Sequence, residues 1–397
     1  MRIAILTNTF PPDGRGGAER IAWIQAKHLA ALGHSVHVWK PIGPEEPETD
    51  GYEVSEFTSS FYSLPTHGPL FRLFFHLFDL RSARKLVREI LEWKPDALVT
   101  HNVIGCGIGT ARAVQKKNVR WLHVLHDVQL FEPSGQIRAN ERKHIFSSLW
   151  RIFWAGRRRS HFGIPDVFVS PTRWLLDRYH TYGFSAKADA ILPNPIDDDL
   201  AKLSEESRPF ISPASILYAG RLSEDKGFGM FLRALRMLDP KVVLSGIVIA
   251  GDGPLLSDAH GIDDERMECV GWLSPEEIPI AIKNAALLIA PSLLQENQQT
   301  ILLEAMAVGT PAIATDVGGT HETLEGTGCP VLPTNQDLGL AIANEIKRIL
   351  SDGVVWKQLS DAMRQQAKKH EVGEYIKRLV EAMAIQETPT PPISVSS

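Results

Sequence analysis

Short, wholly apolar runs alternate along the chain with longer segments whose apolar residues recur at helical spacing. The first such run, Arg2–Thr7, leads into a Pro/Gly loop, and helical spacing then continues to Gly33. A run that is apolar at consecutive positions is typical of a strand buried on both faces of a parallel sheet. This alternation predicts a first group of strands at Arg2–Thr7, Ser35–Trp39, Asp96–Thr100, Arg120–Leu125, Asp166–Ser170 and Ala190–Leu192.

The alternation stops after Pro195, where a polar, acidic segment runs to Pro213. A second series then predicts strands at Ser215–Ala219, Gly246–Ala250, Met267–Val270, Ala286–Ala290 and Pro311–Thr315. Strands that alternate with helices form parallel, doubly wound sheets. We therefore expect an α/β protein with two doubly wound, Rossmann-like domains that face each other across a cleft.

The domain boundaries follow from these breaks. The chain has 397 residues, which is too long for one hydrophobic core. We place an N-terminal Rossmann-like domain at residues 1–196, a linker at 197–212 and a C-terminal Rossmann-like domain at 213–370. A helix at 371–386 is expected to pack back on the N-terminal domain. Residues 387–397, rich in proline, serine and threonine, are expected to be disordered.

The composition narrows the class of function. A net charge of −5 gives no overall basic balance, so nucleic acid is not an expected partner. Cys106, Cys269 and Cys329 lie far apart, which indicates a reducing compartment and no zinc site. No apolar stretch approaches the roughly 20 residues that span a bilayer, and the run at Met1–Phe10 is too short for a signal peptide. We expect a cytoplasmic location.

The loops that follow the predicted strands carry the candidate chemistry, because ligands of doubly wound sheets bind outside the carboxyl ends of the strands. In the first loop, Gly16 and Gly17 precede a helix, so a ligand oxyanion can approach the backbone and the helix N-terminus. The loop lacks the G-x-G-x-x-G fingerprint of dinucleotide binding, which disfavours a dehydrogenase. A plain strand-to-helix turn explains these glycines equally well.

Two cations follow the first strand of the second domain. Arg221 stands at the strand end and Lys226 at the start of the next helix, with Gly220 and Gly227 beside them. A diphosphate needs fixed cations when no metal neutralises it. Solvated surface charges are the alternative, and the flanking glycines favour a phosphate site.

Two glutamates eight residues apart form the most specific pattern. Glu296 lies in a loop after a strand, and Glu304 lies in the following helix beside Ile301, Leu303 and Met306. An ionised carboxylate among apolar neighbours needs a partner, and vicinal sugar hydroxyls offer two donors to one carboxylate. The helix N-terminus between the glutamates suits a pyrophosphate. Taken singly, each residue also fits a surface glutamate.

Further short motifs accompany these loops, at Ser170-Pro-Thr-x-Trp174, Leu192-Pro-Asn194-Pro-Ile-Asp197, Gly251-Asp-Gly253-Pro254 and Gly318-Gly319-x-x-Glu322. With the glycine loop, the paired cations and the E-x7-E spacing of the glutamates, they resemble the retaining GT-B glycosyltransferases of family four. The resemblance covers nearly the whole chain. It implies that the N-terminal domain binds an acceptor and the C-terminal domain binds a nucleotide sugar.

The resemblance also implies a role for individual residues. Arg221 and Lys226 would hold the diphosphate, Glu304 would accept from the ribose hydroxyls, and Glu296 would contact the transferred sugar. His126 would lie near the reacting carbon and complete the catalytic set, with His123 of the same strand as the competing histidine. The donor would in addition contact Gly16, Gly17, Trp272, Leu273, Gln299, Thr300 and Ile301.

Two departures from the family pattern affect this assignment. The chain has Glu-Asn-Gln-Gln at 296–299 where many members have E-x-F-G, and Asn194 is followed by proline instead of glycine. The missing glycine bears on how closely that backbone approaches the donor. The Glu-Asn pair resembles a subset often linked to bacterial surface polysaccharides.

The implied reaction is retaining transfer of a hexose-type sugar from a nucleotide-diphosphate donor to a hydroxyl acceptor. We favour a UDP-sugar over a GDP-sugar, and a lipid-linked or polysaccharide acceptor. No cofactor and no metal are expected, and Asp197-Asp198-Asp199 fits a solvated acidic run better than a metal site. With no clear side-chain nucleophile, front-face substitution is the expected mechanism. A nucleotide-sugar 2-epimerase and a non-catalytic nucleotide-sugar-binding protein are the alternatives.

Basic segments interleaved with aromatic residues predict an anionic membrane surface as a partner of the N-terminal domain. Residues 69–89 join four phenylalanines to five Lys/Arg, and residues 138–160 carry seven Lys/Arg and one Glu, a local charge of +6 in a chain of −5. Such stretches suit a peripheral, interfacial helix attracted to anionic lipid, and changing Arg157, Arg158 and Arg159 to serine is expected to weaken that attraction. The alternative is apolar packing on the sheet with solvated cations.

Overall fold

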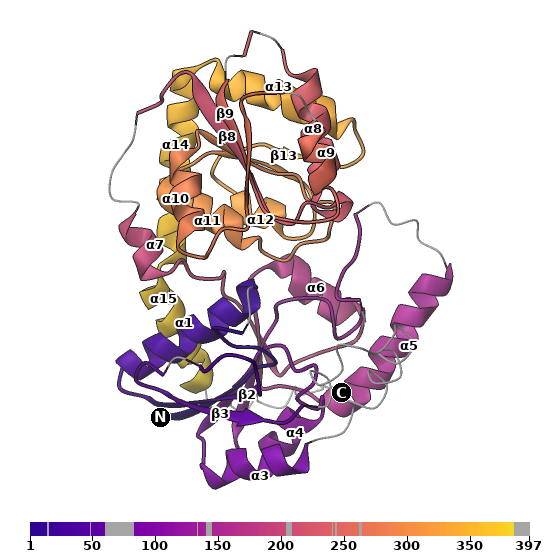
Figure 1. The fold of residues 1–397 in the computed structure, drawn as a ribbon. Coiled ribbons are helices and arrows are strands. Elements are labelled where there is room, and N and C mark those ends of the chain that lie inside the picture. Colours follow the sequence, from indigo (N-terminus) through magenta and orange to yellow (C-terminus); the bar gives the residue numbers. More distant parts are fainter. Residues whose placement is uncertain are drawn as a thin grey trace, which may run out of the picture.

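The computed structural model of the chain is shown in Figure 1. It describes residues 1–13, 16–47, 49–59, 83–132, 134–139, 145–203, 209–239, 241–242, 244–261 and 264–384, and the side chains at 145–148 and 201 are not described. Most of the basic segment at 69–89 and the tail at 387–397 therefore lie outside the described residues. Within the described residues, no helix combines the length and apolarity needed to cross a membrane.

The N-terminal half forms a parallel sheet with helices on both faces. Within the described residues its strands, in sheet order, are β3 (Glu53–Phe57), β2 (Ser35–Pro41), β1 (Arg2–Leu6), β4 (Ala97–Thr100), β5 (Arg120–Val124), β6 (Val167–Ser170) and β7 (Ala188–Ile191). The helices are α1 (Gly17–Ala31), α3 (Arg84–Glu92), α4 (Thr110–Gln115), α5 (Ile145–Phe162) and α6 (Arg173–Thr181). Side chains on the two sheet faces form two separate hydrophobic cores, as expected for strands that are apolar on both sides.

The second half repeats this architecture. Its strands, in sheet order, are β10 (Met267–Gly271), β9 (Leu244–Ala250), β8 (Ala214–Ala219), β11 (Leu287–Ala290), β12 (Ala312–Thr315) and β13 (Val331–Leu332). The helices are α7 (Asp198–Lys202), η1 (Glu224–Lys226), α8 (Phe228–Met237), α9 (Leu256–His260), α10 (Glu277–Asn284), α11 (Thr300–Val308), α12 (Thr320–Leu324), α13 (Leu338–Leu350), α14 (Gly353–Ala367), η2 (Lys368–His370) and α15 (Val372–Ala384). The described strand pairs in both sheets are parallel.

The last helix returns to the first domain. In Figure 1, α15 descends from the upper, C-terminal domain and lies beside α1. Tyr375, Ile376 and Leu379 of α15 belong to the hydrophobic core that covers one face of the N-terminal sheet. The Arg378 guanidinium donates to the carbonyl oxygen of Ile191 at 2.9 Å. The helix α15 thus completes a hydrophobic core of the N-terminal domain.

Two short strands were not predicted from the sequence. β3 reads Glu-Val-Ser-Glu-Phe, lies at an edge of the sheet, and is half exposed. β13 has two residues and lies at an edge of the second sheet. Edge strands are half solvated, so they lack the continuous apolar run that marks a central parallel strand.

Candidate active site

A cleft of about 1210 Å³ separates the two domains at the carboxyl ends of both sheets. Its walls come from the loops after β1, β4 and β5 on one side and after β8, β9, β10 and β11 on the other. This is the edge at which doubly wound sheets bind ligands. Its lining includes most of the residues that the sequence predicts for the donor site, namely Gly16, Gly17, His126, Lys226, Trp272, Leu273, Glu296, Gln299, Thr300, Ile301 and Glu304.

Lys226 and Glu296 meet inside this cleft. The Lys226 Nζ lies 2.5 Å from Oε1 of Glu296, and the Ser292 hydroxyl donates to the same oxygen at 2.9 Å. Gly227, which follows Lys226, has a φ of 71°, and a Cβ there would lie 1.7 Å from the carbonyl oxygen of Pro291. Glycine at 227 therefore allows the turn that brings the cation to the glutamate.

Arg221 lies apart from this pair. Its guanidinium is bonded to Asp225 Oδ2 at 2.5 Å, its side chain is 51% exposed, and it is not among the residues that line the cleft. The ion pair joins residues four apart around the turn after β8. Against the opposing effect of burial, the Ser223 side chain and this ion pair hold the pKa of the Asp225 carboxyl below its usual range. A role for Arg221 at the diphosphate requires its side chain to leave Asp225, and that role remains a prediction.

The N-terminus of α11 opens into the cleft beside the first glycine loop. Gln299 is its N-cap residue and makes no side-chain cap bond, because its side-chain amide donates to Thr320 instead. Unpaired N–H groups at such a helix end favour an anion. Gly17 faces this helix end across the cleft: a Cβ on Gly17 would lie 2.7 Å from the Thr300 methyl. The two domains approach closely here, and a side chain at 17 would not fit without movement.

Glu304, one helical turn further into α11, lines the cleft and is largely surrounded by protein. Burial raises the pKa of its carboxyl from 4.5 to about 7, and the positive charge of Arg20 partly opposes the rise. Within the described part of the chain, no hydrogen bond or ion pair reaches this carboxylate. A buried carboxylate without a partner is costly, so the position is suited to a ligand that donates hydrogen bonds.

The two histidines of the loop and strand at β5 have different environments. His126 lines the cleft, and its Nε2 shares a hydrogen bond of 2.7 Å with Nδ1 of His101. Burial lowers the pKa of His126 to about 4, so its imidazole is neutral at neutral pH. His123 is buried below the cleft and bonds Thr100 at 2.8 Å, which makes it a core histidine.

Trp272 and Leu273 follow β10 and line the cleft. Trp272 is 54% exposed, so its ring is open to a planar ligand. Exposed aromatic rings beside a polar cleft commonly stack on bases or sugars. The loop after β10 therefore offers an apolar platform in the same cleft as the carboxylate of Glu304.

The Glu-Asn-Gln-Gln stretch also holds the two domains together. The Thr172 hydroxyl donates to Asn297 Oδ1 at 2.7 Å, and Asn297 Nδ2 donates to the carbonyl oxygen of His126 at 3.3 Å. The Asn194 N–H donates to Gln298 Oε1 at 2.7 Å. Of the four residues in this stretch, Asn297 and Gln298 are therefore bound to the N-terminal domain.

Glu322 adds a further contact between the domains. Its carboxylate accepts hydrogen bonds from the backbone N–H groups of Arg173 and Trp174 at 2.7 and 2.8 Å. These N–H groups lie at the start of α6, where a negative charge is favourable. The glutamate of the Gly-Gly-x-x-Glu motif thus caps a helix of the opposite domain.

Sequence reasoning missed several residues of the cleft. Ser292 fixes Glu296, and a serine at the end of a buried strand is a signal that could have identified it. Arg20 lines the cleft and pairs with Asp197 at 3.3 Å, which corrects the interpretation of Asp197 as solvated, because its side chain is 5% exposed. Asp127 also lines the cleft, and burial raises its pKa to about 6.

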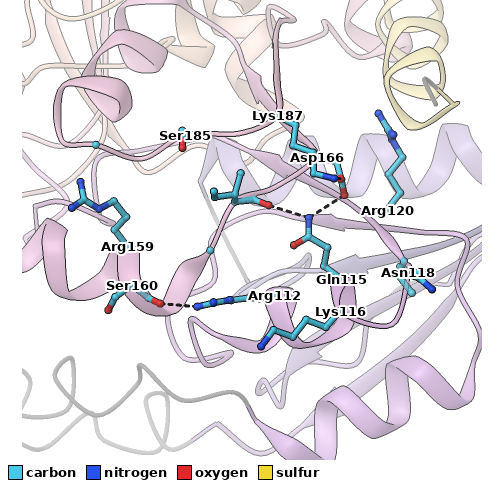
Figure 2. A pocket seen from close by; sticks show the side chains of 14 residues that line it. Arg112, Gln115, Lys116, Asn118, Arg120, Arg159, Ser160, Asp166, Ser185 and Lys187 are labelled. Atoms are coloured by element: carbon cyan, nitrogen blue, oxygen red, sulfur yellow. Dashed lines mark hydrogen bonds and ion pairs between the residues drawn. The ribbon is translucent and has the colours of Figure 1, made fainter. Parts of the chain in front are cut away.

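A second, basic depression of about 950 Å³ lies at the opposite, amino edge of the N-terminal sheet. Figure 2 shows the side chains that surround it, and its cationic members are Arg112, Lys116, Arg120, Arg159 and Lys187. Lys187 is paired with Asp166 at 2.9 Å. The other four have no carboxylate partner among the described residues. The depression therefore carries net positive charge.

Two family models match the chain. The model described as Glycosyltransferase Family 4 matches residues 15–200, and the one described as Glycosyl transferases group 1 matches residues 213–352. The lipopolysaccharide 1,2-N-acetylglucosaminetransferase of Salmonella typhimurium is 30% identical over 94% of this chain and 91% of its own length. An uncharacterized glycosyltransferase of Methanocaldococcus jannaschii is 31% identical over 89% of this chain and 90% of its own.

Solved structures show the same fold. A crystal structure of Anabaena HepE in complex with UDP has a TM-score of 0.69 at 18% identity, covering 96% of this chain and 99% of that one. WaaG, a glycosyltransferase involved in lipopolysaccharide biosynthesis, has a TM-score of 0.69 at 17% identity, covering 97% and 100%. The expected GT-B architecture is confirmed. With matches to both halves and to relatives along most of its length, the chain belongs to the group 1, family 4 glycosyltransferases.

Proposed function

We propose that the protein transfers a hexose-type sugar from a UDP-sugar to a hydroxyl acceptor with retention of configuration. The observation that carries the proposal is the convergence of Lys226, Glu296 and Glu304 with the uncapped N-terminus of α11 in one interdomain cleft. UDP and UDP-glucose are bound in crystal structures of HepE, and the Salmonella relative is named for transfer of N-acetylglucosamine in lipopolysaccharide. Both names support a nucleotide-sugar donor and a surface-polysaccharide acceptor.

We assign a part of the donor to each group on the basis of its position in the cleft. The diphosphate lies between Lys226 and the N-terminus of α11, where a cation and unpaired N–H groups meet it. The ribose hydroxyls donate to the buried Glu304 carboxylate, and the base rests against Trp272. The sugar takes the place beside Glu296. Before the donor binds, Lys226 is held by Glu296, so binding exchanges part of an internal ion pair for contacts to the ligand.

Transfer breaks the bond between the anomeric carbon and the diphosphate oxygen, and the electron pair leaves with UDP. Lys226 and the α11 N-terminus stabilise the charge that develops on that oxygen. The acceptor hydroxyl forms the new bond on the same face and gives its proton to the departing diphosphate, which is the front-face route. We propose that these groups replace a divalent metal.

The proposal is tested by incubating the protein with UDP-glucose, UDP-galactose, UDP-N-acetylglucosamine and their GDP counterparts, with and without extracts of polysaccharide intermediates. Slow release of UDP and labelled sugar from a UDP-sugar, accelerated by an acceptor, is the expected result. Release of free nucleotide with an epimerised free sugar would instead identify a 2-epimerase. Tight binding without any turnover would identify a binding protein.

We further propose that the N-terminal domain docks on an anionic phospholipid surface to reach a lipid-linked acceptor. On α5, Leu149, Ile152 and Phe153 are between 56% and 61% exposed. Arg159, exposed at the end of this helix, also lines the basic depression. An apolar helix face beside unpaired cations suits the boundary between lipid headgroups and acyl chains.

One cation of the expected triplet does not belong to this surface. Arg158 is 1% exposed, donates to the carbonyl oxygen of Gln129 and stacks on Trp154 with its Cζ 4.4 Å from the ring centroid. It is a packing residue, so replacing it would disturb the fold. The surface cations to neutralise are Arg157 and Arg159.

Vesicle co-sedimentation tests the docking. We expect binding to phosphatidylglycerol vesicles and not to phosphatidylcholine vesicles at low salt, with a large loss in the double variant Arg157→Ser, Arg159→Ser and in Ile152→Ser, Phe153→Ser. Arg236→Ser, an exposed cation of the other domain, is the control. Equal recovery in the supernatant with both lipids would overturn the docking and favour a freely diffusing acceptor.

A further inference from the structure

A line of buried hydrogen bonds connects the cleft with the C-terminal helix. Nε2 of His126 bonds Nδ1 of His101 at 2.7 Å, and Nε2 of His101 bonds Oε1 of Gln25 at 3.1 Å. Nε2 of Gln25 donates to the hydroxyl of Tyr375 at 2.7 Å. The line joins the loops after β5 and β4 to α1 and α15. Its last member is 350 residues from Gln25 in the sequence.

The inner members of this line are shielded from water. Gln25 and His101 are 0% exposed and Tyr375 is 5% exposed. Burial, with the nearby His126 and His123, keeps the pKa of His101 well below its usual range, and burial lowers that of His126 to about 4. Both imidazoles are therefore neutral at neutral pH. A neutral imidazole has one N–H and one lone pair, and its partners decide which nitrogen carries the proton.

The amide of Gln25 determines which atom donates and which accepts in each hydrogen bond of the line. Its NH₂ group donates to Tyr375, so its carbonyl faces His101. A carbonyl only accepts, and His101 must therefore carry its proton on Nε2. Nδ1 of His101 is then an acceptor, so His126 donates to it from Nε2. This leaves Nδ1 of His126 with a lone pair, and no group of the described chain hydrogen-bonds that nitrogen.

We propose that Gln25, His101 and Tyr375 are positioning residues that hold His126 as its Nε2–H tautomer, so that Nδ1 accepts a hydrogen bond from a hydroxyl of the bound sugar. The inference rests on the proposed sugar transfer in the cleft. The opposite tautomer would present an N–H instead, to which the sugar hydroxyl would have to act as the acceptor. Through this line α15 influences the reacting centre without reaching the cleft.

The tautomer can be measured without any substrate. In protein labelled with ¹⁵N-histidine, the shifts of the two ring nitrogens distinguish the protonated from the unprotonated one. His126→Gln identifies the resonances of His126 by their loss. We expect a protonated Nε2 and an unprotonated Nδ1 in the wild type, and a mixed or reversed pattern in Tyr375→Phe and Gln25→Leu. A wild type protonated on Nδ1, or a tautomer unchanged in both variants, would overturn the proposal.

Kinetics then connect the tautomer with turnover. Tyr375→Phe keeps the packed ring and deletes the acceptor of the Gln25 amide, and we expect kcat to fall about three- to tenfold, the scale of one lost neutral hydrogen bond. UDP affinity should stay unchanged because UDP carries no transferred sugar. Tyr182→Phe is the control, since Tyr182 stacks on Phe131 at 4.4 Å outside the line. An altered tautomer with unchanged kcat would refute the contact to the sugar.

The two experiments separate this inference from the proposed function. The nitrogen shifts report the line of hydrogen bonds even if the protein transfers no sugar. An expected tautomer in a protein that turns over no donor would refute the function and leave the positioning of His126 intact. A protein that transfers sugar while Nδ1 of His126 is protonated would support the proposed function and refute the positioning of His126.

Discussion

Replacing Glu304 by glutamine should stabilise the free protein and weaken its hold on UDP. The Glu304 carboxyl has its pKa raised from 4.5 to about 7 by burial. Each pKa unit corresponds to about 1.4 kcal/mol, so holding this carboxylate ionised above pH 7 costs roughly 3 kcal/mol. Glutamine has the same shape without the charge. The protein thus keeps a destabilised carboxylate at the position where, in the proposed function, ribose hydroxyls donate hydrogen bonds to it.

The sign of the pH dependence follows from the raised pKa. Between pH 4.5 and about 7 the folded protein keeps a proton on Glu304 that the unfolded chain has lost. The contribution of this group to stability is therefore fully present below pH 4.5 and is lost as pH rises through 7. Glu304→Gln has no carboxyl at this position, so it does not undergo this loss of stability. Its advantage in free energy of unfolding over the wild type should grow from pH 5 to pH 8.

Thermal denaturation of both proteins at pH 5 and pH 8 measures this difference. At about 2–4 °C per kcal/mol for a domain of this size, the Tm advantage of Glu304→Gln should increase by up to about 6–12 °C. Calorimetry with UDP should show weaker binding by the variant at pH 8, and a binding constant that depends less on pH. Glu92→Gln, at the exposed end of α3, is the control. A Tm difference equal at both pH values, or unaltered UDP affinity, would refute the reasoning.

Three further outcomes are expected. Lys226→Ala should lower kcat/KM by roughly 30- to 1000-fold, corresponding to ~2–4 kcal/mol of lost electrostatic stabilisation. Arg221→Ala should lower kcat/KM by less than about tenfold, because the Arg221 guanidinium is held by Asp225. Equal losses in the two variants would show that Arg221 also contacts the diphosphate. Gly17→Ala should lower kcat/KM because its Cβ would lie 2.7 Å from the Thr300 methyl. Adding Thr300→Ser, which removes that methyl group, should restore part of the lost kcat/KM. A double variant with the same kcat/KM as Gly17→Ala would contradict this explanation. Turnover in excess EDTA should match turnover with magnesium or manganese, and activity that is abolished by EDTA and returns with metal would show that a cation is required.

The central strands and the loops after them could be predicted because their signals are local. Continuous apolar runs identify buried strands, and Lys226, Glu296 and Glu304 stand at fixed offsets from strand or helix ends. The half-exposed edge strand Glu53–Phe57 gave no such signal.

Contacts between distant segments could not be predicted in this way. Glu322 and Arg173 are 149 residues apart, and Gln25 and Tyr375 are 350 apart. These pairs depend on how the two domains and the helix α15 pack together. The spacing of apolar residues along the sequence does not predict that packing. Even the local pair Arg221 and Asp225 was missed, because the sequence analysis considered each cation as a ligand and not as the partner of a neighbouring carboxylate.

The loop that carries Glu296, the residue proposed to contact the sugar, continues into Asn297 and Gln298, which hydrogen-bond to the N-terminal domain. A donor bound at Glu296, as proposed, would therefore also affect these hydrogen bonds between the two domains. In the proposed function, an opening of the cleft that releases UDP would break the hydrogen bonds of Asn297, Gln298 and Glu322 to the N-terminal domain, so the residence time of the product would be coupled to these contacts. Weakening these contacts, as in Asn297→Ala, would speed the release of UDP. It would also lower the fraction of molecules whose cleft is in the closed, binding-competent conformation. The same opening would admit water and divert donor into hydrolysis.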